Sequence, residues 1–327
     1  MVYREPLLVT LVLLVDKLPF PAPPKKRGRG RPKEYSDRLI VKALVIMIIR
    51  RLYTAYSLLA FLEQDSALTG QLRDLLTENG RFPTRRTWER RLTSLPTALP
   101  GLIGCFGRYL VTLLRPYDTY GRAVAMDSTM LRAKGGVWHQ KHREQGLVPH
   151  TTIDTDAHWS KSGYHGWWYG WKLHITCTIA AIWIPLAAEL TPANVHDRIP
   201  ATPMAYQLPD EVRYVMGDRH YRDDDLKAYC RLTGRTLITT RPGKYPHQDA
   251  GVEVRKILHR LRHQAIEPFN GFFKNVFEWD GQVPVRGHHR VRLFVLGALI
   301  VYQLVLLYQF QHHKPLGKGV KALLRAA

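Results

Sequence analysis

The pattern of apolar residues changes near residue 120, and this change constrains the fold more than any other feature of the chain. Between residues 36 and 114 the apolar residues recur with the spacing of amphipathic helices. After residue 120, short apolar runs rich in β-branched residues alternate with helical segments. The alternation predicts an α/β domain built around a mixed sheet, with an all-helical region before it.

The helical region contains residues that cap or stop helices. Ser36 or Asp37 is expected to cap its first helix, and Ser57 is expected to cap a second helix. Gly80 is expected to close a third helix, and Thr84 to cap a short fourth one. These residues divide the region into several short helices.

The helix expected after Thr84 is dense in arginine. It contains Arg85, Arg86 and Arg90, and it follows a turn. A short basic helix after a turn is typical of the reading element of a helix-turn-helix DNA-binding domain. A solvated amphipathic helix is the alternative interpretation.

The charge of the chain indicates a polyanionic partner. Lys and Arg number 48 against 27 Asp and Glu, a formal net charge of +21, which favours encounter with nucleic acid. Residues 21–35 are rich in Pro, Gly and basic residues and cannot build a core. Within them, Arg29-Gly30-Arg31-Pro32 resembles the core of an AT-hook, whose arginines enter an A·T minor groove. A basic linker that touches only phosphates is the alternative.

One apolar run raises the question of a membrane. Residues 293–310 form an 18-residue stretch without a formal charge, which is near the lower limit for a spanning helix. Gln303 and Gln309 interrupt the run, and the rest of the chain is highly charged. We therefore expect a buried core helix and no membrane partner.

Two aspartates follow predicted strands of the α/β region. Asp127 ends the apolar run "RAVAMDST" at 122–129, and Asp218 ends "VRYVMGD" at 212–218. Open α/β sheets form their crevices at the carboxyl ends of strands, although an aspartate there can also simply form a turn. Carboxylates brought together repel each other unless cations neutralise them. Their oxygen ligands suit Mg²⁺ or Mn²⁺, and two such ions support phosphoryl transfer.

A third carboxylate is expected in the helical segment 251–279. Glu267 shares a helical face with basic residues, whereas Glu253 and Glu278 lie near the ends of the segment. The basic residues on that face are Arg260, His263 and Lys274. An exposed helical acid that pairs with its neighbours is the alternative interpretation of Glu267.

Five motifs carry a resemblance to a known family. In chain order, "AMDST", "YGWKLHI", "LTPANVHD", "MGDRHY" and "RHQAIEPFNGFFK" resemble the motifs of DDE transposases of bacterial insertion sequences, which have an RNase H-like core. The resemblance covers residues 122–310. It implies that Asp127, Asp218 and Glu267 form a catalytic triad that binds two Mg²⁺ or Mn²⁺ ions.

The resemblance extends to the Tyr-Arg-Glu-Lys helix signature of one branch of the family, with departures. Lys274 matches the signature, but Arg260 stands in place of its Tyr and His263 in place of its Arg, with Arg262 adjacent. Pro268 directly follows the expected glutamate, so we expect the helix to kink or restart there.

The function implied is that of a DNA transposase that cleaves and joins the ends of a mobile element. A DNA-binding protein with a degenerate core and a metal-dependent nuclease without joining activity are the alternatives. A homodimer on double-stranded DNA, in the cytoplasm of a bacterium, is implied by the family. The expected parts are an arm at 1–35, a helical DNA-binding domain at 36–115, a catalytic domain at 120–310 and a basic tail at 311–327. The residues expected to contact DNA are Arg29, Arg31, Arg85, Arg86, Arg90, Lys172, Arg260, His263 and Lys274.

Overall fold

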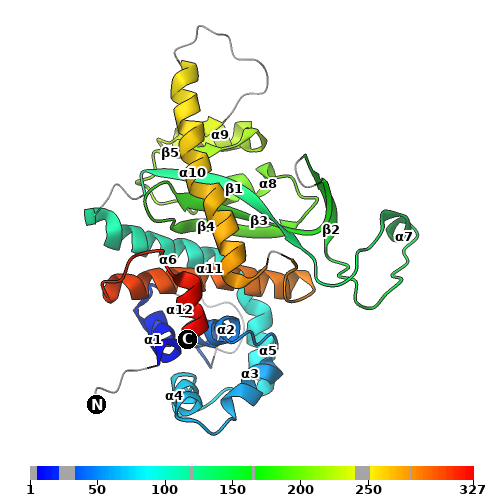
Figure 1. The fold of residues 1–327 in the computed structure, drawn as a ribbon, viewed down its shortest axis with the longest axis vertical. Coiled ribbons are helices and arrows are strands. Elements are labelled where there is room, and N and C mark those ends of the chain that lie inside the picture. The colour runs from blue at the N-terminus through cyan, green and yellow to red at the C-terminus, as the bar shows by residue number, and fades with distance from the viewer. Residues whose placement is uncertain (1–5, 22–33, 118–120, 164–165, 240–250, 280) are drawn as a thin grey trace. The chain divides into compact units, whose positions relative to one another are not determined.

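The computed structural model describes residues 6–21, 34–117, 121–163, 166–239, 251–279 and 281–327 (Figure 1). Packing divides the chain into two compact units. The first comprises Met1–Tyr109 and Arg292–Ala327, and the second comprises Leu110–Val291. This division concerns packing, and the functional boundaries expected at 115, 120 and 310 stay a prediction. Arg29 and Arg31 lie outside the described residues.

The described residues of the first unit are mostly helical. Its helices are α1 (Leu7–Lys17), α2 (Asp37–Ile49), α3 (Ala55–Leu62), α4 (Ala67–Leu75), α5 (Arg85–Ser94), η1 (Leu95–Thr97), most of α6 (Leu99–Leu114), most of α11 (His288–Gln311) and α12 (Val320–Ala326). The Ser36 hydroxyl accepts a hydrogen bond from the Leu39 amide, and the Thr84 hydroxyl accepts one from the Thr87 amide. The expected caps of α2 and α5 are therefore confirmed.

Two other boundaries in this unit were predicted wrongly. Thr54 caps α3, and Ser57 forms the second half of a capping box by accepting from the Thr54 amide. α4 ends before Gly80, which lies with Asn79 in a two-residue turn between the paired Glu78 and Arg81. Both turn residues have positive φ, 52° and 70°, and an Asn-Gly pair adopts such a turn easily.

The long apolar run forms α11. Among the described residues, α11 is the single unbroken helix that is long and apolar enough to cross a membrane, and 89% of its most apolar 18-residue window is buried in the protein. The amide groups of its two polar interruptions donate hydrogen bonds inside the protein. Gln303 Nε2 donates to the Ile103 carbonyl at 2.9 Å, and Gln309 Nε2 donates to the Lys318 carbonyl at 2.7 Å. The run thus packs as the core helix expected from the sequence.

The second unit contains a mixed six-stranded sheet with helices around it. Its strands lie in the order β2-β3-β1-β5-β6, and β4 also pairs with β3. β3 runs antiparallel to β1, β2 and β4, whereas β5 is parallel to both β1 and β6. The expected α/β class, with a mixed sheet after a helical region, is confirmed. The strands are β1 (Ala123–Arg132), β2 (His158–Ser162), β3 (Gly166–Thr178), β4 (Pro185–Pro192), β5 (Tyr214–Gly217) and β6 (Thr236–Thr239); the helices are η2 (Arg115–Tyr117), α7 (Gln140–Glu144), α8 (Arg198–Ala205), η3 (Arg219–Tyr221), α9 (Asp224–Leu232) and α10 (Gly251–Phe277).

The position of Asp127 differs from the expectation. It lies in the middle of β1, which continues to Arg132 in register with β3. The parallel pairing of β1 with β5, however, stops at Ala125 and Met216. Asp127 and Asp218 therefore both follow the point where the two parallel strands separate, which is the placement that the sequence argument needed.

The restart that was one expectation at Pro268 is absent, since α10 continues as one helix through this position. Figure 1 shows it crossing the face of the sheet, where it contacts β1, β3 and β5. Pro268 and Gln264, whose carbonyl loses its helical partner, are exposed, so water can satisfy that carbonyl. Ile266 and Phe269 beside them are fully buried. Packing of the apolar face thus holds the helix through the proline.

We predict that Gly170→Ala destabilises the sheet. A Cβ at this position would lie 2.1 Å from the Leu131 carbonyl oxygen and 2.8 Å from the Ala133 nitrogen, both of them backbone atoms that cannot rotate away. The expected loss is about 3 kcal/mol of unfolding free energy, the upper end of overpacking costs. Gly163→Ala, in the same hairpin with open space around it, is the matched control. Equal denaturation midpoints for the two variants would contradict the prediction.

Candidate active site

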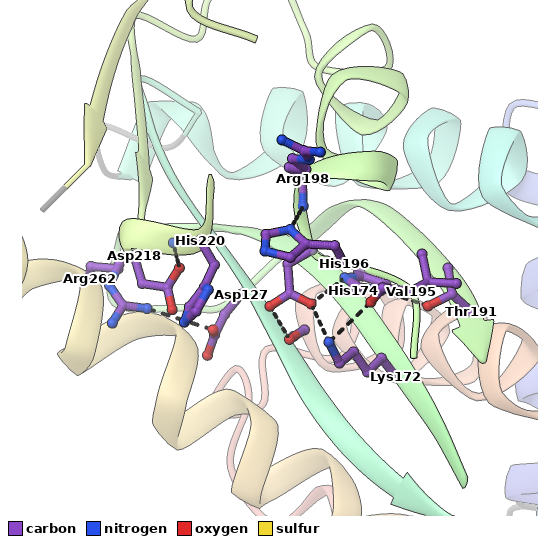
Figure 2. Close-up of polar contacts among 12 residues, drawn as sticks. Asp127, Lys172, His174, Thr191, Val195, His196, Arg198, Asp218, His220 and Arg262 are labelled. Atoms are coloured by element: carbon purple, nitrogen blue, oxygen red, sulfur yellow. Dashed lines mark hydrogen bonds and ion pairs between the residues drawn. The ribbon is translucent and has the colours of Figure 1, made fainter. Parts of the chain in front are cut away.

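Three carboxylates predicted from the sequence lie near one another beside the buried Arg262; Figure 2 shows two of them, Asp127 and Asp218, with this arginine. Asp127 projects from β1, and Asp218 follows β5, where its Oδ1 accepts a 2.8 Å hydrogen bond from the His220 amide. Glu267 projects from α10. On the same helix, the Arg262 guanidinium lies 3.8 Å from Asp127 Oδ1 and 3.6 Å from Glu267 Oε1. The fold therefore brings residues from three distant parts of the sequence to one place.

Asp127 is the most buried of the three carboxylates. Burial raises its pKa to about 7, Arg262 opposes the rise, and Asp218 and Glu267 add to it by charge repulsion. Asn270 Nδ2 on α10 donates a 3.2 Å hydrogen bond to Asp127 Oδ2. The negative charge of Asp127 is thus costly in this site unless a proton or a cation neutralises it.

A second polar cluster lies on the other side of β1 and was not predicted. Ser128 points away from Asp127 because successive strand residues face opposite sides, and its hydroxyl donates to Asp197 Oδ2 at 3.1 Å. Lys172 Nζ donates to Asp197 Oδ1 at 2.9 Å and to the Val195 carbonyl at 3.1 Å. Burial would raise the pKa of Asp197, but the Lys172 ammonium outweighs it and holds that pKa below its usual range.

The sequence held a weak signal for this second cluster. Asp197 closes the motif "LTPANVHD", and an aspartate at such a place usually indicates a turn or a helix cap. It does stand at the N-cap of α8, but its side chain makes no capping hydrogen bond. It is instead committed to β1 and β3. Pattern alone could not distinguish these two uses of an aspartate before a helix.

Tyr221 lies between the two clusters. Its side chain is fully buried, and its hydroxyl has no hydrogen-bond partner among the described residues. Burial raises the pKa of Tyr221 well above its ordinary value, and the charges of Asp197, Asp127 and Asp218 raise it further. A Cβ at Gly217 would lie 2.8 Å from the Tyr221 Cβ. Gly217 therefore provides the space in which Tyr221 packs directly before the Asp218 turn.

The other predicted site residues fall in three settings. His263 and Lys274 are partly exposed on α10, and the His263 ring contacts Glu267, whereas Arg260 is exposed. Lys172 is mostly buried, with its ammonium bonded inside the protein, so its role as a phosphate ligand stays a prediction. On α5 in the first unit, Arg85 pairs with Glu89, and Arg86 and Arg90 are exposed.

The residues around Asp127 have the donor chemistry of a divalent metal site. Carboxylate oxygens are the ligands that Mg²⁺ and Mn²⁺ prefer, and a cation already lies between Asp127 and Glu267 in the form of Arg262. Within the described part of the chain, no group of three or more acidic, histidine or cysteine side chains is arranged to hold a single ion. The arrangement suits ions held by pairs of carboxylates that share Asp127.

Comparison with known proteins identifies the family. A protein-family model described as "Transposase DDE domain" matches residues 120–304, more than half of the chain. The chain belongs to the DDE transposase family. The resemblance stated from the motifs is thus confirmed at the level of the family, whereas the bacterial insertion-sequence origin and the Tyr-Arg-Glu-Lys branch stay predictions. No curated protein matches the transposase.

Two solved structures resemble the transposase weakly. The Mos1 transposase paired-end complex with left transposon end is 12% identical, with a TM-score of 0.22 over 84% of this chain and 79% of that chain. A pre-cleavage Mos1 transpososome is 10% identical, with a TM-score of 0.19 over 86% and 80% of the two chains. Because these TM-scores are low, the description of the transposase rests on the family match and on the geometry of the site.

His174 predicts a specific pH dependence of stability. Its side chain is fully buried, its Nε2 lies 2.9 Å from the Thr191 hydroxyl, and burial lowers its pKa to about 4. The unfolded chain therefore binds a proton near pH 6.5 that the folded protein accepts only near pH 4, so stability falls as pH falls through this window.

We expect the wild type to lose about 3 kcal/mol more unfolding free energy between pH 7 and pH 4 than His174→Gln, which has no such proton to bind. Urea denaturation at several pH values measures the difference. His150→Gln, an exposed histidine, is the control and should keep the wild-type slope. Parallel curves for wild type and His174→Gln would contradict the prediction.

Proposed function

We propose that this DDE transposase binds the ends of an insertion sequence and performs metal-dependent strand cleavage followed by strand transfer. The observation that supports this most is the convergence of Asp127, Asp218 and Glu267 around Arg262. Turn-forming aspartates and a solvated helical glutamate have no reason to meet at one place. A shared, partly buried carboxylate site is what phosphoryl transfer requires.

The roles follow from the positions of the residues. Asp127 and Asp218 would hold one Mg²⁺ or Mn²⁺ ion, and Asp127 and Glu267 the other. When bound, the two ions would stabilise the attacking and leaving oxygens of the phosphodiester. Asn270 fixes the orientation of Asp127 through its hydrogen bond. The burial of Asp127 by α10 limits competing water at this carboxylate.

DNA binding would involve both units. The net charge of +21 and the exposed Arg86 and Arg90 of α5 suit phosphate contacts. On α10, Arg260, His263 and Lys274 lie on the helix that carries Glu267 and would hold phosphates near the cleaved bond. The AT-hook-like arm with Arg29 and Arg31 would add minor-groove contacts. We further propose a homodimer that bridges two element ends in a bacterial cytoplasm.

Two narrower functions remain as alternatives. A DNA-binding protein with a degenerate core is favoured by the departures from the signature at Arg260 and His263. The unbroken α10 weighs against it, because the helix presents Glu267 in spite of Pro268. A nuclease that cleaves without joining would use the same three carboxylates.

The triad is tested with labelled DNA carrying candidate element ends, target DNA and Mg²⁺. We expect Asp127→Asn, Asp218→Asn and Glu267→Gln each to lower cleavage and joining about a hundredfold or more, because several kcal/mol of transition-state stabilisation are lost. Asp225→Asn removes an equal charge from the exposed side of α9 and serves as the matched control.

Each outcome of that experiment has a meaning. Cleavage without joining by the wild type would favour the nuclease. Activity that survives Glu267→Gln would move the third ligand elsewhere, with Glu278 the next candidate. DNA binding without any metal-dependent cleavage by the wild type would favour the alternative function, a DNA-binding protein with a degenerate core.

The role of α5 is tested by the salt dependence of DNA binding. Arg86→Gln with Arg90→Gln should weaken binding and reduce the slope of log affinity against log salt by about 2, since two phosphate contacts are lost. Lys227→Gln with Arg231→Gln removes an exposed pair at the same spacing on α9 and is the control. Equal slopes for the two double variants, measured by fluorescence anisotropy, would exclude α5 as the preferred DNA contact.

A further inference from the structure

Arg262 is an unusually placed cation. Its side chain is 6% exposed, yet its two ion pairs are 3.8 Å and 3.6 Å long, beyond the 2.7–2.9 Å that charge-assisted hydrogen bonds prefer. Its Nε and Nη1 atoms make no hydrogen bond to any described residue. The guanidinium is thus held near the carboxylates by charge, without the bidentate geometry that usually satisfies a buried arginine.

The surroundings of Arg262 explain why it stays there. Asp127, Asp218 and Glu267 carry up to three negative charges at close range, and the carboxylates raise one another's energy. Arg262 is the cation whose charge most strongly favours an ionised Asp127. It lies on the same continuous helix as Glu267 and Asn270, so its backbone position relative to them is set. Only rotation of the long side chain can remove the guanidinium from between the carboxylates.

We propose that Arg262 is a built-in counter-ion that competes with divalent cations for Asp127 and Glu267. The inference rests on the proposed metal site and adds a step to its loading, in which the guanidinium turns away from the carboxylates. A DNA phosphate is the partner that suits the released guanidinium, because arginine binds phosphate oxygens in a bidentate way. DNA and metal then bind cooperatively, since each favours the rotated side chain.

The decisive experiment titrates Mn²⁺ into the metal-free protein. The electron paramagnetic resonance signal of free Mn²⁺ measures how much remains unbound. Arg262→Gln removes the competing charge and should bind Mn²⁺ at least threefold more tightly than the wild type. Arg262→Lys keeps the charge and should stay near the wild-type affinity. Lys227→Gln removes the same charge from an exposed position on α9, outside the site, and should leave the Mn²⁺ affinity unchanged.

Cooperativity supplies a second readout. Addition of duplex DNA should tighten Mn²⁺ binding to the wild type and do so less in Arg262→Gln, whose carboxylates are already free. A purely structural role for Arg262 would lower the melting temperature of the variant without raising its metal affinity. Equal or weaker Mn²⁺ binding by folded Arg262→Gln would overturn the proposal, as would failure of every variant to bind Mn²⁺.

If Arg262→Gln does not fold, the displacement of Arg262 by metal can still be tested on the wild type. The Nε–H resonance of Arg262, assigned by its loss in Arg262→Lys, should shift and exchange faster with solvent when Mg²⁺ is added. An unchanged resonance at saturating Mg²⁺ would contradict the displacement. None of these readouts depends on cleavage. A protein that binds Mn²⁺ as expected but cuts no DNA would therefore contradict the proposed function and still support Arg262 as a counter-ion.

Discussion

The site depends on the unequal lengths of two strand pairings made by β1. The strand pairs with β3 along nearly its whole length, but its parallel pairing with β5 stops at Ala125. Beyond that point the two strands no longer share hydrogen bonds, and Asp127 and Asp218 follow it close enough for the charge of Asp218 to raise the pKa of Asp127. Had β5 continued in register with β1, pairing would have filled the space that the two carboxylates share.

Charge neutralisation is solved differently on the two sides of β1. Asp197 is satisfied by Lys172 and Ser128 at hydrogen-bonding distances, which makes that cluster a fixed support for β1 and β3. Asp127 has Arg262 at 3.8 Å, beyond hydrogen-bonding distance, and it accepts a hydrogen bond from the Asn270 amide. A buried polar network whose hydrogen bonds are all made rigidifies a structure. A buried ion with few hydrogen bonds can still gain free energy when a partner of opposite charge binds to it. The Asp197 side is therefore held by hydrogen bonds within the protein, whereas the Asp127 side is where the proposed cations would bind.

Local pattern predicted most of the elements, and its errors have physical causes. The strands, the helices α8 and α9 and the caps at Ser36 and Thr84 follow from hydrophobic spacing and side-chain hydrogen bonds, both of which act within a few residues. Two departures arose where distant residues overrode a local preference, whereas the boundaries misplaced at Ser57 and Gly80 involve only neighbouring residues. Packing against the sheet holds α10 as one helix through Pro268, and pairing with β3 extends β1 past Asp127.

The sequence by itself determined the class of fold and the basic character of the chain, because hydrophobic period and net charge can be read without coordinates. Its resemblance to the family also pointed to three carboxylates, which the structure brings near one another. Only the tertiary structure decided that Asp197 turns to Lys172, that Tyr221 packs against Gly217, and that Arg262 rather than His263 lies between Asp127 and Glu267. These outcomes depend on which face of a strand or helix meets which neighbour, and Asp127 and Arg262 meet across more than a hundred residues of chain. Such contacts are set by the register and packing of the whole sheet, which no local stretch of sequence contains.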